Sequence, residues 1–242
     1  MSYQGTPPIP SSNSWDLAAR ETHQQSFVQR VYGWMAGGLL LTAAASAVTV
    51  MSPTVVKAVF GSPLLWVLLI LELGLVIGLS AAINRMSAAT ATLLFLLYAA
   101  INGVTLAGIF FVYTAQSIAT AFVVTSLTFG ATAAYGAVTK RDLTSVGSFM
   151  FMGLIGLIIA SVVNFWFQSP MIYWLTTYFG VFIFVGLTAY DAQKIKQIGM
   201  SAALDREGSG RASIIGALRL YLDFINLFLF MLRIFGGGRS RD

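Results

Sequence analysis

The chain has 242 residues, of which 57% are hydrophobic and only 10% are charged, and its mean hydropathy is +0.79. A soluble domain would need a core large enough to hide several runs of about 20 apolar residues, so this composition excludes an ordinary soluble protein. The net charge of +5 comes mainly from residues in loops and tails, which argues against a nucleic-acid-binding surface.

Residues 1–30 are rich in Ser, Pro and Gln and cannot bury enough apolar surface to fold alone, so we expect a flexible polar tail. The apolar run that follows contains Ala45-Ser46-Ala47, a triplet that resembles a signal-peptidase site. The segment before it is unusually long, and the chain stays hydrophobic beyond it. We therefore expect an uncleaved first membrane helix.

Seven apolar runs are each near the length of about 20 residues that a helix needs to cross a bilayer. They cover residues 31–51, 64–83, 90–113, 118–138, 145–167, 172–190 and 214–235. The runs are continuous, whereas barrel strands would alternate apolar and polar residues, so we predict an all-α integral membrane protein. The predicted domains are the tail 1–30, a seven-helix transmembrane domain over 31–235 and a short C-terminal tail over 236–242.

Basic residues gather in alternate connections, which predicts the orientation of the helices. They precede the first run and recur in every second connection, at Arg20, Arg30, Arg85, Lys140, Arg141, Lys194, Lys196, Arg206 and Arg211. The connections on the other side hold only Lys57. The positive-inside rule then places the N-terminus in the cytoplasm. Arg233, Arg239 and Arg241 would lie outside after a full last span and inside after a re-entrant one, and the length of the last run favours the full span.

Two aspartates are candidate functional residues, because a charge at mid-membrane costs roughly 2.5–3.5 kcal/mol on insertion scales. Asp223 lies inside the last apolar run, and Asp191 closes the previous one. If these helices are neighbours, the two carboxyls can share a proton and titrate as one coupled unit. Their oxygens are also suitable ligands for calcium, which would then compete with the proton. An alternative pairs Asp223 with Arg219, four residues earlier on the same helix face.

Glu72 is a third carboxyl inside an apolar run. It is either a protonated acid hydrogen-bonded to a neighbouring helix or an acidic step along an ion path. Asn226 shares a helix face with Asp223 and is a candidate for the same path, although asparagines in membrane helices more often hydrogen-bond other helices. Cysteine is absent and the single histidine, His23, lies in the polar tail, so a proton switch inside the membrane must use carboxyls.

Several short motifs follow one another along the chain. They are Gln29-Arg30-Val31-Tyr32, Leu71-Glu72, Lys140-Arg141-Asp142-Leu143-Thr144, Tyr190-Asp191-Ala192-Gln193-Lys194-Ile195 and Leu220-Tyr221-Leu222-Asp223-Phe224-Ile225-Asn226-Leu227-Phe228. Together they resemble the Bax inhibitor-1 family, also called the transmembrane BAX inhibitor motif family, and its bacterial members in particular. The resemblance covers nearly everything after residue 25, and its last motif is the most specific.

The resemblance implies a seven-helix bundle whose last helix is surrounded by the other six, with a pH-sensitive calcium leak through it. The family's two-aspartate pH sensor falls on Asp191 and Asp223. Its latch arginine has a loose counterpart in Arg85, displaced by a couple of positions from the family pattern. Calcium would be the permeant ion, with the two aspartates as candidate ligands and no bound cofactor, and the protein would lie in the inner (plasma) membrane.

Two other functions are weighed beside the leak. Relatives of this family are associated with restraining a membrane quality-control protease and with stress responses, so the chain could be an interaction protein whose N-terminal tail contacts that partner. Intramembrane aspartyl proteases also use two membrane aspartates, one of them in a Tyr-Asp pair such as Tyr190-Asp191. They place the other in a Gly-x-Gly-Asp context followed by Pro-Ala-Leu, which Asp223 lacks. The sequence therefore predicts a protein that is not an enzyme.

Overall fold

The computed structural model describes residues 12–201 and 206–236, and within these ranges the regular elements are helices. In chain order they are α1 (Ser12–Met51), α2 (Pro53–Phe60), α3 (Leu64–Ala82), η1 (Ile83–Arg85), α4 (Ala88–Leu106), α5 (Ile109–Val112), α6 (Ala115–Val138), α7 (Thr144–Phe167), α8 (Pro170–Ser201) and α9 (Arg206–Phe235). Seven spans in the described chain are long and apolar enough to cross a membrane, with α4 and α5 forming one of them. The predicted all-α membrane bundle is confirmed.

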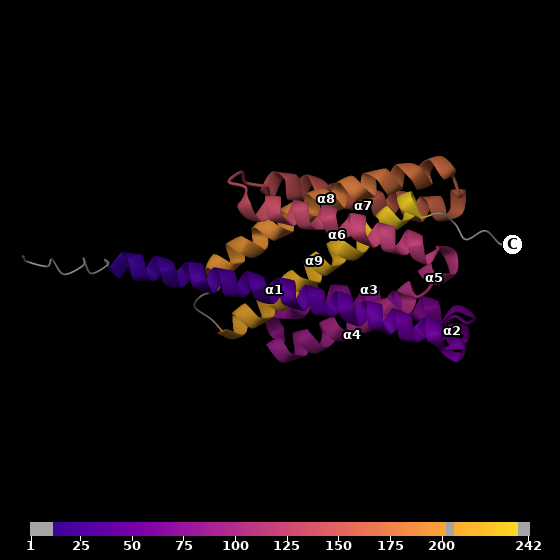
Figure 1. Cartoon of the computed structure of the whole chain (residues 1–242), viewed down its shortest axis with the longest axis horizontal. Coiled ribbons are helices and arrows are strands. Elements are labelled where there is room, and N and C mark those ends of the chain that lie inside the picture. Colours follow the sequence, from indigo (N-terminus) through magenta and orange to yellow (C-terminus); the bar gives the residue numbers. More distant parts are fainter. Residues whose placement is uncertain (1–11, 202–205, 237–242) are drawn as a thin grey trace, which may run out of the picture.

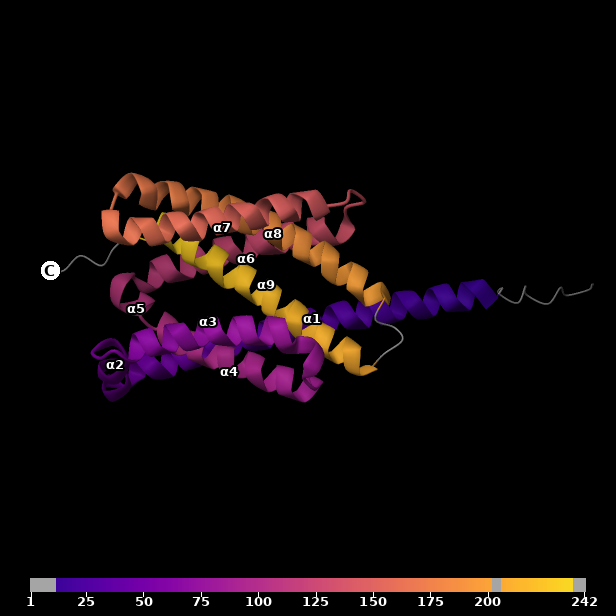
Figure 2. The ribbon, with the colours of Figure 1, turned by 180° about the vertical axis from the view of Figure 1, so that it is seen from behind.

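The helices form two layers with α9 running diagonally between them (Figures 1 and 2). One layer holds α1 to α4, and the other holds α6, α7 and α8. Helix α9 packs directly against α1, α4, α6 and α8, whereas α3 packs mainly on α4, and α7 on α8. The last helix is therefore central, as predicted, although α3 and α7 lie further from it than the other helices.

Burial along the chain explains this arrangement. Leu220, Tyr221 and Leu227 on α9 are fully buried, because apolar side chains cover that helix on several sides. On α3, by contrast, Trp66 and Ile70 are 60% and 71% exposed, as expected for a helix whose outer face contacts lipid rather than water.

Glycines allow some helices to pack at very short distances. A Cβ atom on Gly136 of α6 would collide with the backbone carbonyl of Ala189 on α8. A Cβ atom on Gly103 of α4 would meet the carbonyl of Thr42 on α1 in the same way. Each contact joins two helices of the same layer, α6 to α8 and α4 to α1. Neither glycine position has room for a larger residue.

The first helix begins much earlier than the polar composition of residues 1–30 suggests. Helix α1 starts at Ser12, and residues 1–11 lie outside the described residues. Phe27 and Val31 are buried. Nearby, the Gln24 side-chain amide donates to the Lys196 carbonyl at 3.1 Å. Packing against the end of α8 therefore stabilises a helix that its composition alone would not support.

Helix α8 also continues past the predicted end at residue 190, so Asp191 lies within a helix rather than at its end. Gln193 explains the extension. Its Oε1 accepts a hydrogen bond from the Leu143 backbone at 2.9 Å, and its Nε2 donates to the Arg141 carbonyl at 2.7 Å. In the same connection, hydrogen bonds from the Thr144 hydroxyl and amide to Asp142 lower the pKa of that exposed carboxyl and fix the start of α7.

Helix α9 is one continuous helix that begins near one end of the bundle and finishes at the other (Figure 1). This favours the full last span over a re-entrant segment. Arg233, near its end, stacks on the rings of Tyr173 and Phe230. Residues 237–242, most of the predicted C-terminal tail, lie outside the described residues.

Candidate functional site

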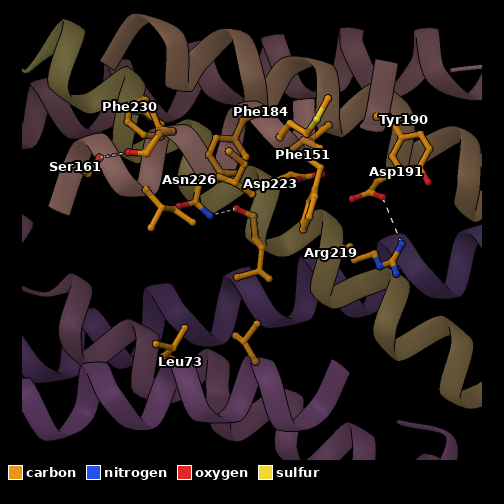
Figure 3. A pocket seen from close by; sticks show the side chains of 18 of the residues that line it. Leu73, Phe151, Ser161, Phe184, Tyr190, Asp191, Arg219, Asp223, Asn226 and Phe230 are labelled. Carbon is orange, nitrogen blue, oxygen red and sulfur yellow. Dashed lines mark hydrogen bonds and ion pairs between the residues drawn. The ribbon is translucent and has the colours of Figure 1, made fainter. Parts of the chain in front are cut away.

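Asp191 on α8 and Asp223 on α9 line the same cavity in the interior of the bundle (Figure 3), and their carboxyls are close enough to interact electrostatically. Asp223 is only 4% exposed, and the Asp191 side chain is 13% exposed. Two carboxyls can form a hydrogen bond only when one of them carries a proton, because an ionised carboxylate is solely an acceptor. The structure thus brings together the two aspartates predicted from the sequence in a geometry suited to sharing a proton.

An arginine lies beside the pair. Arg219 Nη1 is 3.7 Å from Asp191 Oδ1, and the Arg219 side chain is about half exposed (Figure 3). The alternative from the sequence, an ion pair between Arg219 and Asp223 along one helix, is replaced by a pair between α9 and α8. This contact joins the same two helices as the carboxyl pair does.

Arg85, the predicted latch, lies elsewhere. It is the last residue of η1 and is exposed. The carbonyl of the next residue, Met86, accepts a hydrogen bond from Arg211 near the start of α9 at 3.2 Å. Asp223 follows twelve residues later on α9, about 18 Å at a rise of 1.5 Å per residue. In the described part of the chain, the arginine that contacts Asp191 is therefore Arg219, and Arg85 is too far along the helix axis to replace it.

The carboxyl pair lines a cavity of about 1130 Å³. Side chains from α3, α4, α7, α8 and α9 form its wall, and most of them are apolar. Asp223 Oδ2 is buried there without a hydrogen-bond partner. Such an atom is costly to leave alone in a medium of low dielectric constant, and it marks this part of the cavity as the place where a donor or cation would be stabilised.

Glu72 also lines the cavity, but its hydrogen bonds point toward α4. Its Oε2 accepts from the Asn102 amide at 3.1 Å, and its Oε1 accepts from the Thr105 hydroxyl at 2.7 Å. The Tyr221 hydroxyl on α9 donates to Asn102 Oδ1 at 2.9 Å and lies 2.6 Å from the Thr42 hydroxyl on α1. A buried polar network therefore joins α1, α3, α4 and α9, in agreement with the expected hydrogen bonding of Glu72 to a neighbouring helix.

The hydrogens of this network depend on the protonation of Glu72. The hydroxyls of Thr42 and Tyr221 take part in three contacts: with each other, between Tyr221 and Asn102 Oδ1, and between Thr42 and the Ala99 carbonyl at 2.8 Å. The two hydroxyls carry only two hydrogens, so one of the three contacts lacks a donor. Turning the Asn102 amide by 180° would supply the missing donor to Tyr221. Asn102 Oδ1 would then face Glu72, which would have to be protonated in order to donate to it. The orientation of the Asn102 side-chain amide is thus linked to the protonation of Glu72.

Asn226 lines the cavity near Asp223, yet its side-chain amide donates to the Leu222 carbonyl of its own helix at 2.8 Å. It makes no interhelical hydrogen bond in the described chain, unlike Asn102. The Asn226 side-chain oxygen is not used in that hydrogen bond and can still accept one. A position of Asn226 on the predicted ion path is therefore compatible with the geometry.

Calcium usually takes six to eight oxygen ligands. The two carboxyls of Asp191 and Asp223 provide at most four oxygens, and in the described residues no group of three or more His, Cys, Asp and Glu residues gathers to hold a metal.

Sequence reasoning did not assign a role to Tyr221, Thr42 or Thr105. A signal for Tyr221 was present, because a hydroxyl inside an apolar run must find a partner, but its partners belong to helices distant in sequence. The threonines gave no comparable signal, since most threonines in membrane helices bond to their own backbone, as Thr188 does with Phe184.

Residues 24–240 match the family described as "Inhibitor of apoptosis-promoting Bax1". The chain belongs to the Bax inhibitor-1 family. It is 51% identical over 217 residues to the inner membrane protein YbhL of Escherichia coli K12, a match that covers 89% of this chain and 93% of YbhL. It is also 43% identical over 218 residues to an uncharacterized protein of Borreliella burgdorferi, covering 90% of this chain and 94% of that protein. Neither the family description nor these names describe an enzyme.

Within this Bax inhibitor-1 family chain, the motifs quoted from the sequence fall on the contacts just described. Tyr190 to Ile195 hold Asp191 and Gln193, and Leu220 to Phe228 hold Tyr221 and Asp223. The first of these motifs supplies half of the carboxyl pair and fastens the α6–α7 connection. The second supplies the other half and the centre of the polar network.

Proposed function

We propose that this protein is a pH-sensitive cation leak with calcium as the permeant ion, and that Asp191 and Asp223 form its proton switch. The observation that carries the proposal is the pair of carboxyls, one from each of two adjacent membrane helices, at the wall of a cavity inside the bundle. A lone carboxyl could be a structural accident, whereas two that must share a proton form a switch with a defined chemical input.

The switch acts through the contact between α8 and α9. The shared proton ties the two helices together. Loss of the proton leaves two negative charges in a medium of low dielectric constant, where they repel one another. The half-exposed Arg219 compensates only one of them. A calcium ion that enters the cavity competes with the proton for the same oxygens.

The orientation and location belong to the same proposal. The basic segments at η1 and between α6 and α7, together with the end of α8 and the start of α9, lie at the end of the bundle where α1 begins (Figure 1). By the positive-inside rule this end is cytoplasmic. YbhL is described as an inner membrane protein, and a chain with seven spans in that membrane would carry calcium and protons between the cytoplasm and the outside.

The carboxyl pair also matches the geometry that an intramembrane aspartyl protease would need. The leak is preferred because Asp223 lies in an unbroken helix and lacks both the Gly-x-Gly-Asp context and the Pro-Ala-Leu segment of those proteases. Release of peptides from a membrane-spanning model substrate by the purified protein would favour the protease instead.

An interaction with a membrane quality-control protease remains a second proposal, favoured by the part of α1 that extends beyond the bundle (Figure 2). Such an extension offers a helical surface to a partner at the membrane face. Co-purification of that protease with the full chain, lost when residues 1–20 are removed, would support it.

Calcium flux into liposomes tests the proposed leak. Purified wild type should admit calcium with a steep dependence on pH near neutrality, and Asp191→Asn or Asp223→Asn should each remove the pH dependence. Asp142→Asn is the matched control, because Asp142 is an exposed carboxyl outside the spans and should leave the profile unchanged. If both membrane variants keep the wild-type profile, the pair is not the sensor and Glu72 becomes the next candidate.

A further inference from the structure

The cavity opens toward the lipid between α3 and α7. Leu69 and Leu73 line it from α3, and Phe151, Met152 and Ile158 line it from α7. These side chains are between 40% and 63% exposed. Because α3 packs mainly on α4, and α7 on α8, neither helix closes the gap, and α9 is seen between the two layers in Figure 2.

The rim of this opening selects what can enter it. Helix α7 carries no charged residue, and Glu72 is the only one on α3, where it bonds to α4. A hydrated ion would have to leave water and cross hydrocarbon to arrive by this route, which is very costly. A molecule dissolved in the membrane, by contrast, would only exchange lipid neighbours for apolar side chains.

The inner wall of the cavity is acidic. Glu72, Asp191 and Asp223 line it, against a single lining arginine in the described chain, Arg219, which already pairs with Asp191. Asp223 Oδ2 is buried and has no hydrogen-bond partner. Phe151 and Phe184 line the same cavity from α7 and α8 (Figure 3). Aromatic faces attract cations, most strongly where water is excluded.

We propose that the cavity binds a lipophilic amine from the membrane, with its protonated nitrogen donating to Asp223 Oδ2 and its alkyl chain lying between α3 and α7. The cavity volume of about 1130 Å³ lies just above the range of about 300–1,000 Å³ in which pockets hold drug-sized ligands, so the cavity has room for such a molecule. A fatty acid would bring a negative charge to an acidic wall. A neutral alcohol could satisfy Oδ2 but would leave the charge of the wall uncompensated. This site does not depend on the calcium leak, since it requires only the cavity and the carboxyl.

Photolabelling of the full chain in liposomes tests the proposal. The probe is dodecylamine carrying a photoreactive diazirine near the end of its chain, and the labelled peptides are identified by mass spectrometry. We expect saturable labelling of peptides from α3 and α7, with competition by unlabelled dodecylamine at least tenfold stronger than by dodecanol or dodecanoate. Equal competition by all three would show that the cavity accepts any hydrocarbon chain, and unsaturable labelling would show only partition into lipid. Either result overturns the proposal.

Two sets of variants locate the site. Asp223→Asn keeps the size of the side chain and should weaken competition by dodecylamine at least tenfold. Leu73→Trp should block the opening, whereas Ile70→Trp, at an exposed α3 position that does not line the cavity, should leave labelling unchanged. If Leu73→Trp and Ile70→Trp behave alike, the amine enters elsewhere and the inference fails. The competition series on wild type decides the matter even where Asp223→Asn does not fold, and calcium flux plays no part in it.

Discussion

Removal of the Arg219 guanidinium tests whether the contact between α9 and α8 holds the proposed leak closed. At a separation of 3.7 Å, a unit charge pair near a protein surface is worth about 4 kcal/mol before screening. Because Arg219 is 49% exposed, water and salt reduce this strongly, and exposed pairs typically contribute about 0.2–1 kcal/mol. We take the upper end of that range, since Asp191 is mostly buried. About 1 kcal/mol changes the ratio of closed to open protein roughly fivefold.

Arg219→Ala should therefore raise calcium flux into liposomes roughly fivefold at a pH at which wild type is closed. Arg85→Ala is the matched control, because it removes an arginine that is exposed and distant from the pair, and it should leave the flux unchanged. In an Asp191→Asn background, Arg219→Ala should add little, since its partner has already lost the charge. The coupling between the two changes should be about 0.5 kcal/mol or more.

Two results would refute this reasoning. Additive effects of Arg219→Ala and Asp191→Asn would show that the ion pair does not contribute to closure. An equal rise in flux for Arg85→Ala and Arg219→Ala would show that the flux responds to the loss of a positive charge in general rather than to the contact with Asp191.

Three further predictions follow from the fold. A topology reporter fused after residue 20 should be read as cytoplasmic and one inserted at Gly61 as external, and a common side for both would make the first span wrong. Tyr221→Phe keeps the buried ring but removes a hydroxyl with two partners, so the free energy of unfolding in mixed detergent micelles should fall by about 1–2 kcal/mol. An unchanged free energy of unfolding would mean that the network is not formed. Gly136→Ala should cost about 1–3 kcal/mol in the same assay because its Cβ meets the Ala189 carbonyl, whereas Gly130→Ala, with open space around the added carbon, should not destabilise the fold.

The seven spans could be predicted closely from the sequence because apolar length is a local property and the bilayer sets the length required. Asp191 and Asp223 could be singled out for a similar reason, since a charge inside an apolar run is visible without any knowledge of packing. The helical segment before residue 30 could not be predicted, because Phe27 and Val28 lie in a mostly polar stretch and Phe27 becomes a core residue through tertiary contacts such as the one with α8.

The partners of the site residues were also beyond local reasoning. Arg219 lies four residues before Asp223, which suggested a pair within one helix, but the side chain reaches across to α8. Arg85 was chosen from a family pattern counted along α3, and the fold places it near the start of α9 rather than beside Asp223. The opening between α3 and α7 depends on how far apart two outer helices pack, which no periodicity in either helix reveals.

The central position of α9 has a consequence for the biogenesis of the protein. Helix α9 follows all its packing partners in chain order, so the ribosome releases the centre of the bundle after the surrounding helices have been made. Until α9 inserts, Asp191 lacks the neighbouring carboxyl of Asp223, and Asn102 lacks the hydrogen bond from the Tyr221 hydroxyl. The inner faces of α1, α4, α6 and α8 then contact lipid or one another. Insertion of α9 carries its own barrier, since an aspartate at mid-membrane costs a few kcal/mol that the apolar residues of the helix must offset. Completion of the core is therefore the last step of assembly, and a chain halted before it would display buried polar groups to the membrane's quality-control machinery.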